Sequence, residues 1–402
     1  MVKLSSVAEI LNGDRSSNYP SGKDFIAYGI PFINAGHLKN GKIDFSNMDY
    51  ISKQKYEQLS GAKIQKKDIL LCLRGSLGKY AVAEIDAGAP ASSIAVIRPN
   101  ETIISSEFLT CIISSFLFQK QIDLENNGSS QPNLSASSVA NFIIPFPPLD
   151  EQKRIAEALS DVDELISSLE KLIEKYKSIK ATCLQQMFPQ KGETTPKMRL
   201  PGFTGAWEQR KFSEIVETRR GLTYKPSDIC ENGVRVLRSS NIDDDSFVLR
   251  DDDVFVKAEA VNIDYTKEND ILITAANGSS RLVGKHAIIG QVSPKSTVHG
   301  GFMLLGATKE PYFVNASMGS SWYRHFIELF VSGGNGAIGN LNKNDLDNQD
   351  ILVPSEEERQ KIGVFFKQLD NLITLHQRKL NKAKKIKQGM MQQLLTGKIR
   401  LM

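Results

Sequence analysis

The sequence predicts an α+β protein in which two globular domains alternate with two long antiparallel helices, as an internal repeat with pseudo-twofold symmetry. Two observations predict this class. A long helical stretch that begins at Glu151 recurs without a gap from Glu358, and the segments before the two copies share a looser pattern of short strands, glycines and polar loops. The predicted boundaries are 1–147 for the first globular domain, 148–188 for the first helix, 189–206 for a linker, 207–353 for the second globular domain and 354–402 for the second helix and tail.

The composition is that of an ordinary globular protein. Of the 402 residues, 41% are hydrophobic and 24% are charged, which is enough apolar material for two or more cores. The N-terminus has no secretion signal, and the longest apolar run, 108–118, is too short to span a bilayer. The four cysteines show neither metal-site nor disulfide-framework spacing. We therefore expect a cytoplasmic protein that does not enter a membrane.

The charge distribution permits a nucleic-acid partner without demanding one. The net charge of +4 excludes a uniformly basic coat, and basic residues are concentrated after Pro354. The basic run 378–387 (RKLNKAKKIK) falls in the second helix. Phosphate contact and a solvated helix end that interacts well with the helix dipole are both open explanations of this run.

The first globular domain is predicted from short apolar runs separated by glycine, proline, asparagine and serine. Strands are expected over 29–35, 68–73 and 93–98, and one helix over 106–121. A polar loop at 126–133 then precedes a buried strand and two prolines. This pattern is typical of an α+β domain.

The first long helix follows these prolines, with Asp150 as its expected N-cap. Its apolar residues recur alternately four and three positions apart, a period near 3.5 that indicates a helix packed lengthwise against another. The second long helix repeats this pattern. The predicted seam consists of Ile155, Leu159, Val162, Ile166, Leu169 and Ile173 in the first helix and of Ile362, Phe366, Leu369, Ile373 and Leu380 in the second.

A lysine falls on the seam at the same place in both helices, at Lys180 and Lys387. Such a charged pair can fix the register of the two helices at some loss of stability. A lysine whose ammonium extends out of a fraying helix end is the alternative.

The second globular domain repeats the plan of the first after a linker rich in proline and glycine. Segment 270–273 (DILI) matches 68–71 (DILL), and a Gly-Lys pair follows in both domains, at 284–285 and 78–79. A polar loop at 333–340 matches the loop at 126–133. The scaffold positions are thus retained while the loops differ.

The order of the segments favours antiparallel helices. The first helix ends where the second domain begins, and that domain feeds the start of the second helix. An antiparallel pair joins these ends without strain, whereas a parallel pair forces the second domain to bridge about 55 Å. We expect the two domains at opposite ends of the helix pair, related by a pseudo-twofold axis.

The C-terminal tail echoes the linker. Residues 398–401 (KIRL) match 197–200 (KMRL), a strand-like piece that introduces the second domain. We therefore expect the C-terminus to lie beside the first domain, in the role that 197–200 has beside the second.

The sequence contains no recognisable catalytic motif. The nearest approach to a phosphate-binding loop, 277–286 (NGSSRLVGKH), has the wrong glycine spacing and a histidine after its lysine. No G-x-S-x-G, H-E-x-x-H or Asn-Pro-Pro-aromatic motif occurs, and the five histidines are scattered. We expect this chain to have no catalytic residue, no metal site and no bound cofactor.

Recognition chemistry recurs instead, at matching places in the two domains. Each carries a loop rich in glycine, serine and basic residues after its central strand. Glycine lets backbone amides approach a phosphate, and arginine, asparagine and serine supply donors to phosphates or base edges. Taken singly, each loop is also explained as a surface turn. The candidates are Asn34, His37, Arg74, Ser76 and Lys79 in the first domain and Arg219, Arg220, Tyr224, Lys225, Arg238, Ser240, Asn241, Asn277, Ser279, Arg281 and Lys285 in the second.

The two helical segments resemble the conserved regions of type I restriction-modification specificity subunits. The resemblance rests on 147–166 (PPLDEQKRIAEALSDVDELI) and 354–373 (PSEEERQKIGVFFKQLDNLI), with 197–215 and 392–401 similar to the borders of the same family. It covers the whole chain as an alternation of target recognition domain and conserved helix. One departure is that the leader KMRLPGFTGAW, which precedes the second domain, has no counterpart before the first.

The resemblance implies a function. Each target recognition domain would read one half of a split, asymmetric site in double-stranded DNA, and the helix pair would fix the spacer between the halves. Two modification subunits would dock on the chain, bind S-adenosylmethionine and methylate adenine N6. Two restriction subunits would add ATP- and Mg-dependent translocation and cleavage.

Two other classes stay open at this stage. A scaffold whose seam joins two protein-binding domains predicts no salt-dependent DNA binding, even with partners present. A self-sufficient enzyme requires a nucleotide or metal site that the sequence does not show.

Overall fold

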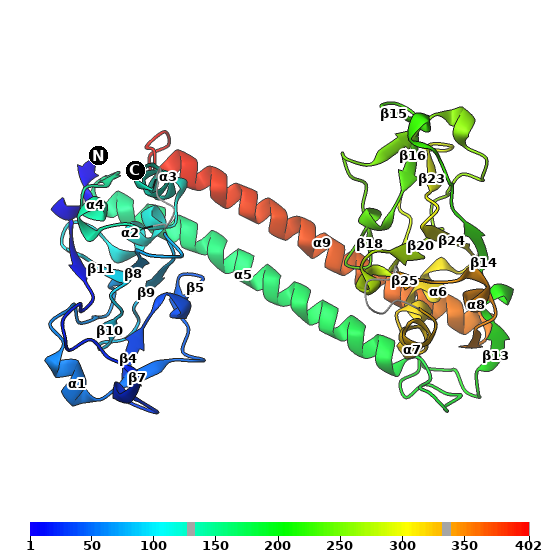
Figure 1. The fold of residues 1–402 in the computed structure, drawn as a ribbon, viewed down its shortest axis with the longest axis horizontal. Helices are drawn as coiled ribbons and strands as arrows, with labels where there is room; N and C mark the ends of the chain where they lie inside the picture. The colour runs from blue at the N-terminus through cyan, green and yellow to red at the C-terminus, as the bar shows by residue number, and fades with distance from the viewer. Residues whose placement is uncertain (127–132, 332–338, 402) are drawn as a thin grey trace. The chain divides into compact units, whose positions relative to one another are not determined.

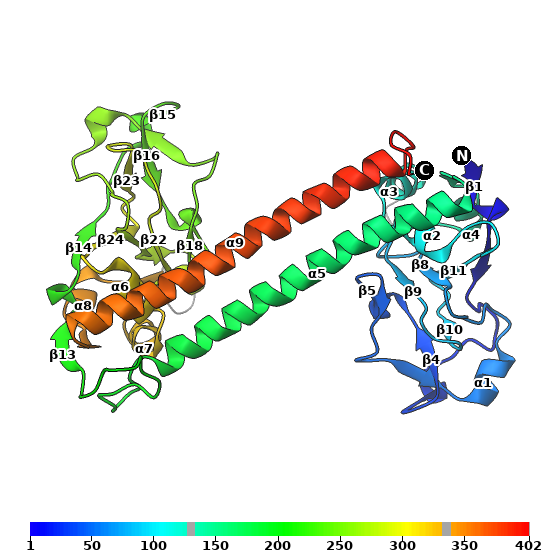
Figure 2. The same ribbon diagram turned by 180° about the vertical axis from the view of Figure 1, so that it is seen from behind.

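The chain folds into two compact units, and the computed structural model describes residues 1–126, 133–331 and 339–401 (Figures 1 and 2). Unit 1 consists of Met1–Leu169 and Lys379–Met402, and unit 2 of Glu170–Arg378. Each unit therefore combines one globular domain with parts of both long helices. The polar loops predicted at 126–133 and 333–340 fall mostly outside the described residues.

The globular part of unit 1 is a mixed α+β structure. Its strands are β1 (Val2–Lys3), β2 (Ala8–Asn12), β3 (Phe25–Ile26), β4 (Ile30–Ile33), β5 (Leu38–Lys39), β6 (Lys42–Ile43), β7 (Asp49–Ile51), β8 (Ile69–Cys72), β9 (Tyr80–Val82), β10 (Ala89–Pro90), β11 (Ile94–Pro99) and β12 (Ile143–Ile144). Its helices are α1 (Lys53–Gln58), α2 (Ser106–Ile113), α3 (Phe116–Glu125) and α4 (Ala136–Ala140).

Two four-stranded sheets organise the described part of unit 1. The antiparallel sheet β2-β11-β8-β9 lies under the helices, and the sheet β10-β4-β7-β3 pairs β10 parallel with β4. Strand β8 is buried on both faces. Ile69 and Leu71 join the core beneath the helices, while Leu70 and Cys72 face a second core, because successive side chains of a strand point to opposite sides.

The globular part of unit 2 repeats this plan. Its strands are β13 (Glu208–Lys211), β14 (Glu217–Arg220), β15 (Ile229–Cys230), β16 (Val234–Leu237), β17 (Ile242–Asp243), β18 (Ser246–Phe247), β19 (Val254–Val256), β20 (Ile271–Thr274), β21 (Ala276–Asn277), β22 (His286–Ile288), β23 (Thr297–His299), β24 (Met303–Ala307), β25 (Gly339–Asn340) and β26 (Asp350–Val353). Its helices are α6 (Pro311–Met318), α7 (Ser321–Phe330) and α8 (Lys343–Asp347).

The main sheets of the two units match. The sheet β14-β24-β20-β22 corresponds to β2-β11-β8-β9, and the parallel pair β16 and β23 corresponds to β4 and β10. Asn133-Leu134 corresponds to Asn340-Leu341, because the amides of Leu134 and Leu341 donate to equivalent carbonyls, of Leu73 and Ala275, at 2.8 and 2.7 Å. The internal repeat predicted from the sequence is therefore present in the fold.

The two long helices are α5 (Leu149–Gln186) and α9 (Glu356–Leu394), of 38 and 39 residues. Within each unit they run antiparallel. In unit 1 the start of α5 shares a core with the end of α9, and in unit 2 the end of α5 lies against the start of α9, where Phe188 packs on Phe366 (Figures 1 and 2). Of the described residues, no helix is both long enough and apolar enough to cross a membrane.

The predicted seam faces inward along both helices. The fully buried members are Ile155, Leu159, Leu169, Ile173, Ile362, Phe366, Leu369 and Leu380, and the half-buried members are Val162, Ile166 and Ile373. The period of 3.5 therefore identified the packed face of each helix. His376, which continues the seam in α9, stacks on Tyr176 with ring centroids 5.5 Å apart.

The seam lysines form reciprocal ion pairs. The Nζ atom of Lys180 lies 2.7 Å from Asp370 in unit 2, and that of Lys387 lies 2.6 Å from Asp163 in unit 1. Because both members of each pair are retained in both repeats, one contact is made twice. Each lysine is thus paired across the seam, which favours a role in setting register.

Two arginine clasps attach the helix starts to segments outside the globular domains. Arg199 of the linker binds Glu358 through two hydrogen bonds of 2.8 and 2.7 Å, which we call the linker clasp. Arg400 of the tail binds Glu151 in the same bidentate way at 2.6 and 2.5 Å, which we call the tail clasp. The expectation that the tail takes the role of the linker beside the first domain is confirmed.

Three local expectations were wrong. Residues 106–121 form two helices, because the chain turns at Ser114 and Ser115, and the Ser115 hydroxyl donates to the Ile112 carbonyl at 2.6 Å. Asp150 does not cap α5 but lies in its first turn, where its charge still favours the helix dipole. Residues 197–200 form no strand; Arg199 acts through its side chain.

Candidate nucleic-acid interface

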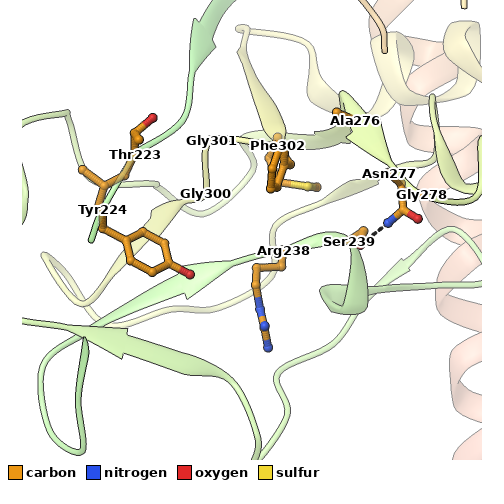
Figure 3. Close-up of a pocket in the computed structure, with 12 residues that line it drawn as sticks. Thr223, Tyr224, Arg238, Ser239, Ala276, Asn277, Gly278, Gly300, Gly301 and Phe302 are labelled. Carbon is orange, nitrogen blue, oxygen red and sulfur yellow. Dashed lines mark hydrogen bonds between the residues drawn. The ribbon is translucent and has the colours of Figure 1, made fainter. Parts of the chain in front are cut away.

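Unit 2 contains a cleft of about 640 Å³ formed by four segments that each border a strand of its sheets. Leu222, Thr223 and Tyr224 follow β14, Arg238 and Ser239 follow β16, and 276–278 follow β20. Residues 300–302 lie between β23 and β24. Figure 3 shows Tyr224 and Asn277 on opposite sides of the cleft, with Phe302 and Arg238 between them.

The cleft floor is fixed by backbone contacts that require glycine. The Leu222 amide donates to the His299 carbonyl at 2.7 Å, which brings the segment after β14 and the segment after β23 together at Gly221 and Gly300. A Cβ atom on Gly221 would lie 2.0 Å from the Gly300 carbonyl oxygen. A side chain there would therefore force these segments apart, since real Cβ atoms do not approach so closely.

The cleft presents polar groups of the kind that read DNA. The Asn277 amide donates to the Ser239 hydroxyl at 3.0 Å, which orients both side chains at one edge. The Arg238 guanidinium donates to the Asp252 carbonyl at 3.4 Å, and its buried Nε has no hydrogen-bond partner among the described residues. Arg238 thus keeps donor capacity that the chain does not use.

Three of the predicted residues line this cleft, and five others lie on nearby segments. Tyr224, Arg238 and Asn277 line it. Lys225 and Ser240 adjoin lining residues and are exposed, as are Ser279 and Arg281 on the turn that follows Asn277. Lys285 is half-buried on the returning limb of that turn and does not line the cleft.

The two predicted arginines of β14 differ in their freedom. Arg219 is tied to two carboxylates, with Nη1 3.1 Å from Asp264 and Nη2 3.7 Å from Asp270. Arg220 is exposed, and its side chain forms no ion pair within the described residues. Arg219 is therefore held by the framework of unit 2, whereas the exposed Arg220 is the freer of the two.

His37 and Asn241 also serve the framework, in equivalent places. Asn241 is fully buried, and its Oδ1 accepts from the Arg238 amide at 2.8 Å while its Nδ2 donates to the Val248 carbonyl at 2.9 Å. In unit 1 the Nδ1 of His37 accepts from the Asn34 amide at 3.1 Å. Each side chain therefore helps to hold the turn after β4 or β16.

The remaining candidates of unit 1 occupy places that correspond to the cleft. Asn34 follows β4 as Arg238 follows β16, and its Oδ1 accepts from the Gly36 amide at 2.8 Å. Arg74 pairs with Asn133 as Ala276 pairs with Asn340, and its side chain is exposed. The same region of the fold in unit 1 therefore offers an asparagine after β4 and an arginine after β8.

Ser76 and Lys79 are exposed on the turn after β8. Gly75 and Gly78 give this turn its shape, with φ of 77° and 78°, values that favour glycine. In unit 2 the turn after β20 ends on Gly284, with φ of 84°. The predicted correspondence of the two Gly-Lys pairs is confirmed, because the carbonyls of Lys79 and Lys285 accept from Cys72 and Thr274 at 2.8 Å in both.

His299 lies directly behind the cleft and is buried. Its Nε2 interacts with the Arg219 carbonyl at 3.2 Å, whereas Nδ1 has no partner among the described residues. Burial lowers the pKa of His299 from 6.5 to about 4, so the ring is neutral at physiological pH. A neutral ring fits its position beside the cationic Arg219.

Sequence reasoning missed three residues at these sites. Thr223 and Phe302 line the cleft, and in unit 1 Arg15 donates to the Ser92 carbonyl at 3.4 Å in the corresponding place. Their signal lies in the repeat, since each adjoins a glycine or strand end that both domains share. Over the described ranges, no group of three or more His, Cys, Asp or Glu residues is placed to hold a metal ion.

Comparisons with known proteins place the chain in a family. The family model described as the type I restriction modification DNA specificity domain matches residues 1–180 and again 205–385. Among curated relatives, the MjaVIII specificity subunit of Methanocaldococcus jannaschii is 24% identical, covering 92% of this chain and 86% of its own length. The EcoKI specificity subunit of Escherichia coli is 25% identical, covering 83% of this chain and 74% of its own.

Solved structures share the fold. A type I restriction-modification system S subunit from M. genitalium matches with a TM-score of 0.60 at 15% identity, over 98% of this chain and 95% of that one. A chain from a study of complex assembly and conformational transition of the type I R-M system matches with a TM-score of 0.57 at 17% identity, over 98% and 96%. With the family model matching both halves, the chain belongs to the type I restriction-modification DNA specificity subunits.

Proposed function

We propose that this chain recognises a bipartite, asymmetric site in double-stranded DNA, with each unit reading one half. The observation that carries the proposal is the contrast between framework and cleft. Equivalent places in the two units hold different side chains, Asn34 against Arg238 and Arg74 against Ala276, while the seam ion pairs and the clasps are repeated. Two similar frames with different contact groups suit two different half-sites.

The long helices set the distance between the half-sites in this proposal. Each helix is continuous over more than ten turns, and a packed, register-fixed pair resists bending better than a flexible linker. The spacer length of the DNA site is then a property of the helices and not of the loops. The chain acts in the cytoplasm, where it meets the DNA.

The same helices supply a surface for catalytic partners. Leu165 and Ile179 of α5 and Ile386 of α9 lie off the seam and are 52%, 36% and 46% exposed. Leu165 and Ile179 are two heptads apart and so share one face, as expected for a helix that receives another subunit. We propose that two modification subunits, which bind S-adenosylmethionine, dock on the chain, and that two restriction subunits add ATP- and Mg-dependent cleavage. The chain itself supplies specificity alone.

The decisive experiment maps methylation in cells. The chain is expressed with the methyltransferase that co-purifies with it, and genomic DNA is sequenced for N6-methyladenine. We expect one split motif with a fixed spacer, present only when both proteins are expressed. Methylation without a split motif, or a motif unchanged when this chain is omitted, would contradict the proposal.

A DNA-binding measurement separates the proposal from a protein scaffold. A specificity subunit with its partner should bind the mapped site, with an affinity that falls steeply as salt is raised, because phosphate contacts release counterions. A scaffold would show no binding that depends on salt.

A further inference from the structure

Phe302 combines an exposed side chain with a firmly held backbone. Its side chain is 70% exposed, which is unusual for a large apolar residue. Its carbonyl accepts hydrogen bonds from the amides of Ala275 and Ala276, at 2.9 and 3.0 Å. The exposure of the ring therefore does not result from a loosely held segment.

The residues before Phe302 hold it in the middle of the cleft. A Cβ atom on Gly301 would lie 3.3 Å from the Leu222 carbonyl oxygen, and one on Gly300 would lie 3.2 Å from the Val236 side chain. The two glycines thus fit closely between the segments after β14 and β16. This placement fixes the direction in which the Phe302 ring enters the cleft (Figure 3).

The surroundings of Phe302 divide into polar and apolar parts. Arg238, Ser239 and Asn277 offer hydrogen-bonding groups, whereas Leu222 and Met303 make the lining mainly apolar. Arginine, serine and asparagine read donors and acceptors on base edges. Phenylalanine has no such group, so its contribution to recognition must be an apolar contact.

Unit 1 has a different residue at this position. The Ser93 carbonyl accepts from the Leu73 amide at 2.8 Å, as the Phe302 carbonyl accepts from Ala275, so the two residues correspond. The backbone is held alike, and only the side chain has changed from hydroxyl to aromatic. The difference therefore belongs to recognition and not to the frame.

In the major groove only thymine presents an apolar group, its C5 methyl. We propose that Phe302 is a specificity-determining residue that contacts the C5 methyl of a thymine in the half-site read by unit 2. This inference rests on the proposed function, since it assigns one contact within a DNA site. Burial of one methyl group against the ring accounts for about a four-fold difference in affinity.

Replacement of thymine by deoxyuridine tests the contact, because it removes the methyl and keeps the hydrogen-bonding edge. The full chain with its methyltransferase partner is titrated with duplexes of the mapped site, in which each thymine of both half-sites is replaced in turn. We expect one replacement, in one half-site only, to weaken binding about four-fold.

Two variants identify the residue responsible. Phe302→Ser installs the side chain of unit 1 and should bind the thymine and uracil duplexes equally. Leu329→Ser is the matched control, since Leu329 is 65% exposed on α7 of the same unit and does not line the cleft. The control should retain the four-fold preference for thymine.

Several results would overturn the inference. These are half-sites without thymine, uracil duplexes that bind the native chain as well as thymine duplexes, and a Phe302→Ser variant that still prefers thymine. If the Phe302 ring instead inserts between base pairs, the native chain should bind uracil duplexes as well as thymine duplexes. Absence of any sequence-specific site is a different outcome and refutes the proposed function itself.

Discussion

Arg400, near the end of the chain, binds Glu151 in unit 1, and Arg199, in the middle of the chain, binds Glu358 in unit 2. The geometry of the two clasps is the same, but the Arg400 side chain is 55% exposed and the Arg199 side chain only 18%. The tail clasp is therefore more exposed to solvent than the linker clasp, although the two have the same hydrogen bonds.

The clefts differ in the opposite sense, since their frames agree and their side chains do not. Phe302 of unit 2 corresponds to Ser93 of unit 1, and His299 behind the cleft corresponds to Pro90, as the parallel pairs β16-β23 and β4-β10 show. The contacts that hold the helices are thus repeated, while the positions that face a ligand vary. Under the proposed function, fold and specificity would reside in separate sets of residues.

Breaking the linker clasp should have the largest effect. Arg199→Ala leaves the Glu358 carboxylate, which is 1% exposed, without its partner, and loss of one member of a buried ion pair costs about 3–5 kcal/mol. We expect urea denaturation to begin at lower concentration, with faster hydrogen exchange in the first turn of α9.

Arg400→Ala is the matched variant in unit 1. Because Arg400 is already half-exposed, we expect a smaller loss, with faster exchange confined to the first turn of α5. Equal losses from the two variants would contradict the difference in shielding.

Lowering the pH should reduce the free energy of unfolding of unit 2, because His299 is held neutral in the folded state. The folded state holds the pKa of His299 at about 4, against 6.5 in the unfolded chain, so the unfolded chain binds more protons between these values. The contribution of His299 to the free energy of unfolding is fully present above pH 6.5. It falls as the pH is lowered towards 4, by about 3 kcal/mol at most.

Chemical denaturation at several pH values, followed by hydrogen exchange in unit 2, measures this effect. His299→Gln keeps a donor for the Arg219 carbonyl but does not titrate. This variant should lose the dependence on pH between 4 and 6.5, and unit 1, with Pro90 at the position, should not show it. A pH dependence that persists in the variant would assign it to another group.

Single arginine changes in the clefts should affect one half-site each. Arg238→Ala should cost about 1–3 kcal/mol of DNA-binding free energy and relax the sequence preference in one half, because in the proposed complex its donors would reach a base or phosphate. Arg74→Ala should do the same in the other half. Competition between duplexes altered in either half-site measures both effects. Equal effects of either variant on both halves would refute separate recognition by the two units.

The seam ion pairs should have the smallest effect. Lys180 and Asp370 are only partly shielded, so removing the pair should cost about 0.5 kcal/mol. A double-mutant cycle with Lys180→Met and Asp370→Asn measures the coupling, and Lys387 with Asp163 should give a similar value. A coupling several-fold larger in one unit would show that the two contacts are not equivalent.

The framework could be predicted from sequence because periodicity and repetition report directly on burial. The seam residues are apolar at a period that only a lengthwise helix pair explains, and the KIRL and KMRL segments indicated both clasps. The broken helix at Ser114 and Ser115 was missed because the apolar run continues through it. Serine hydroxyls that bond to the backbone end a helix without interrupting hydrophobicity.

The cleft was harder to predict because the same residue types serve frame and ligand. His37 and Asn241 are polar residues in a polar segment, yet both are buried and bond to backbone amides. Phe302 has the opposite character, since a lone phenylalanine after a buried strand is typical of a core. Only the folded chain, in which Phe302 is 70% exposed, shows that its side chain is left outside the core.

The frame around Phe302 has a consequence for how such a protein can change. Its neighbours hold it by main-chain hydrogen bonds and by glycines, so little of the folding free energy depends on which side chain stands there. New side chains can therefore be tried at this position without unfolding the protein. Under the proposed function, such a chain would acquire a new DNA target by single substitutions while its helices stay unchanged.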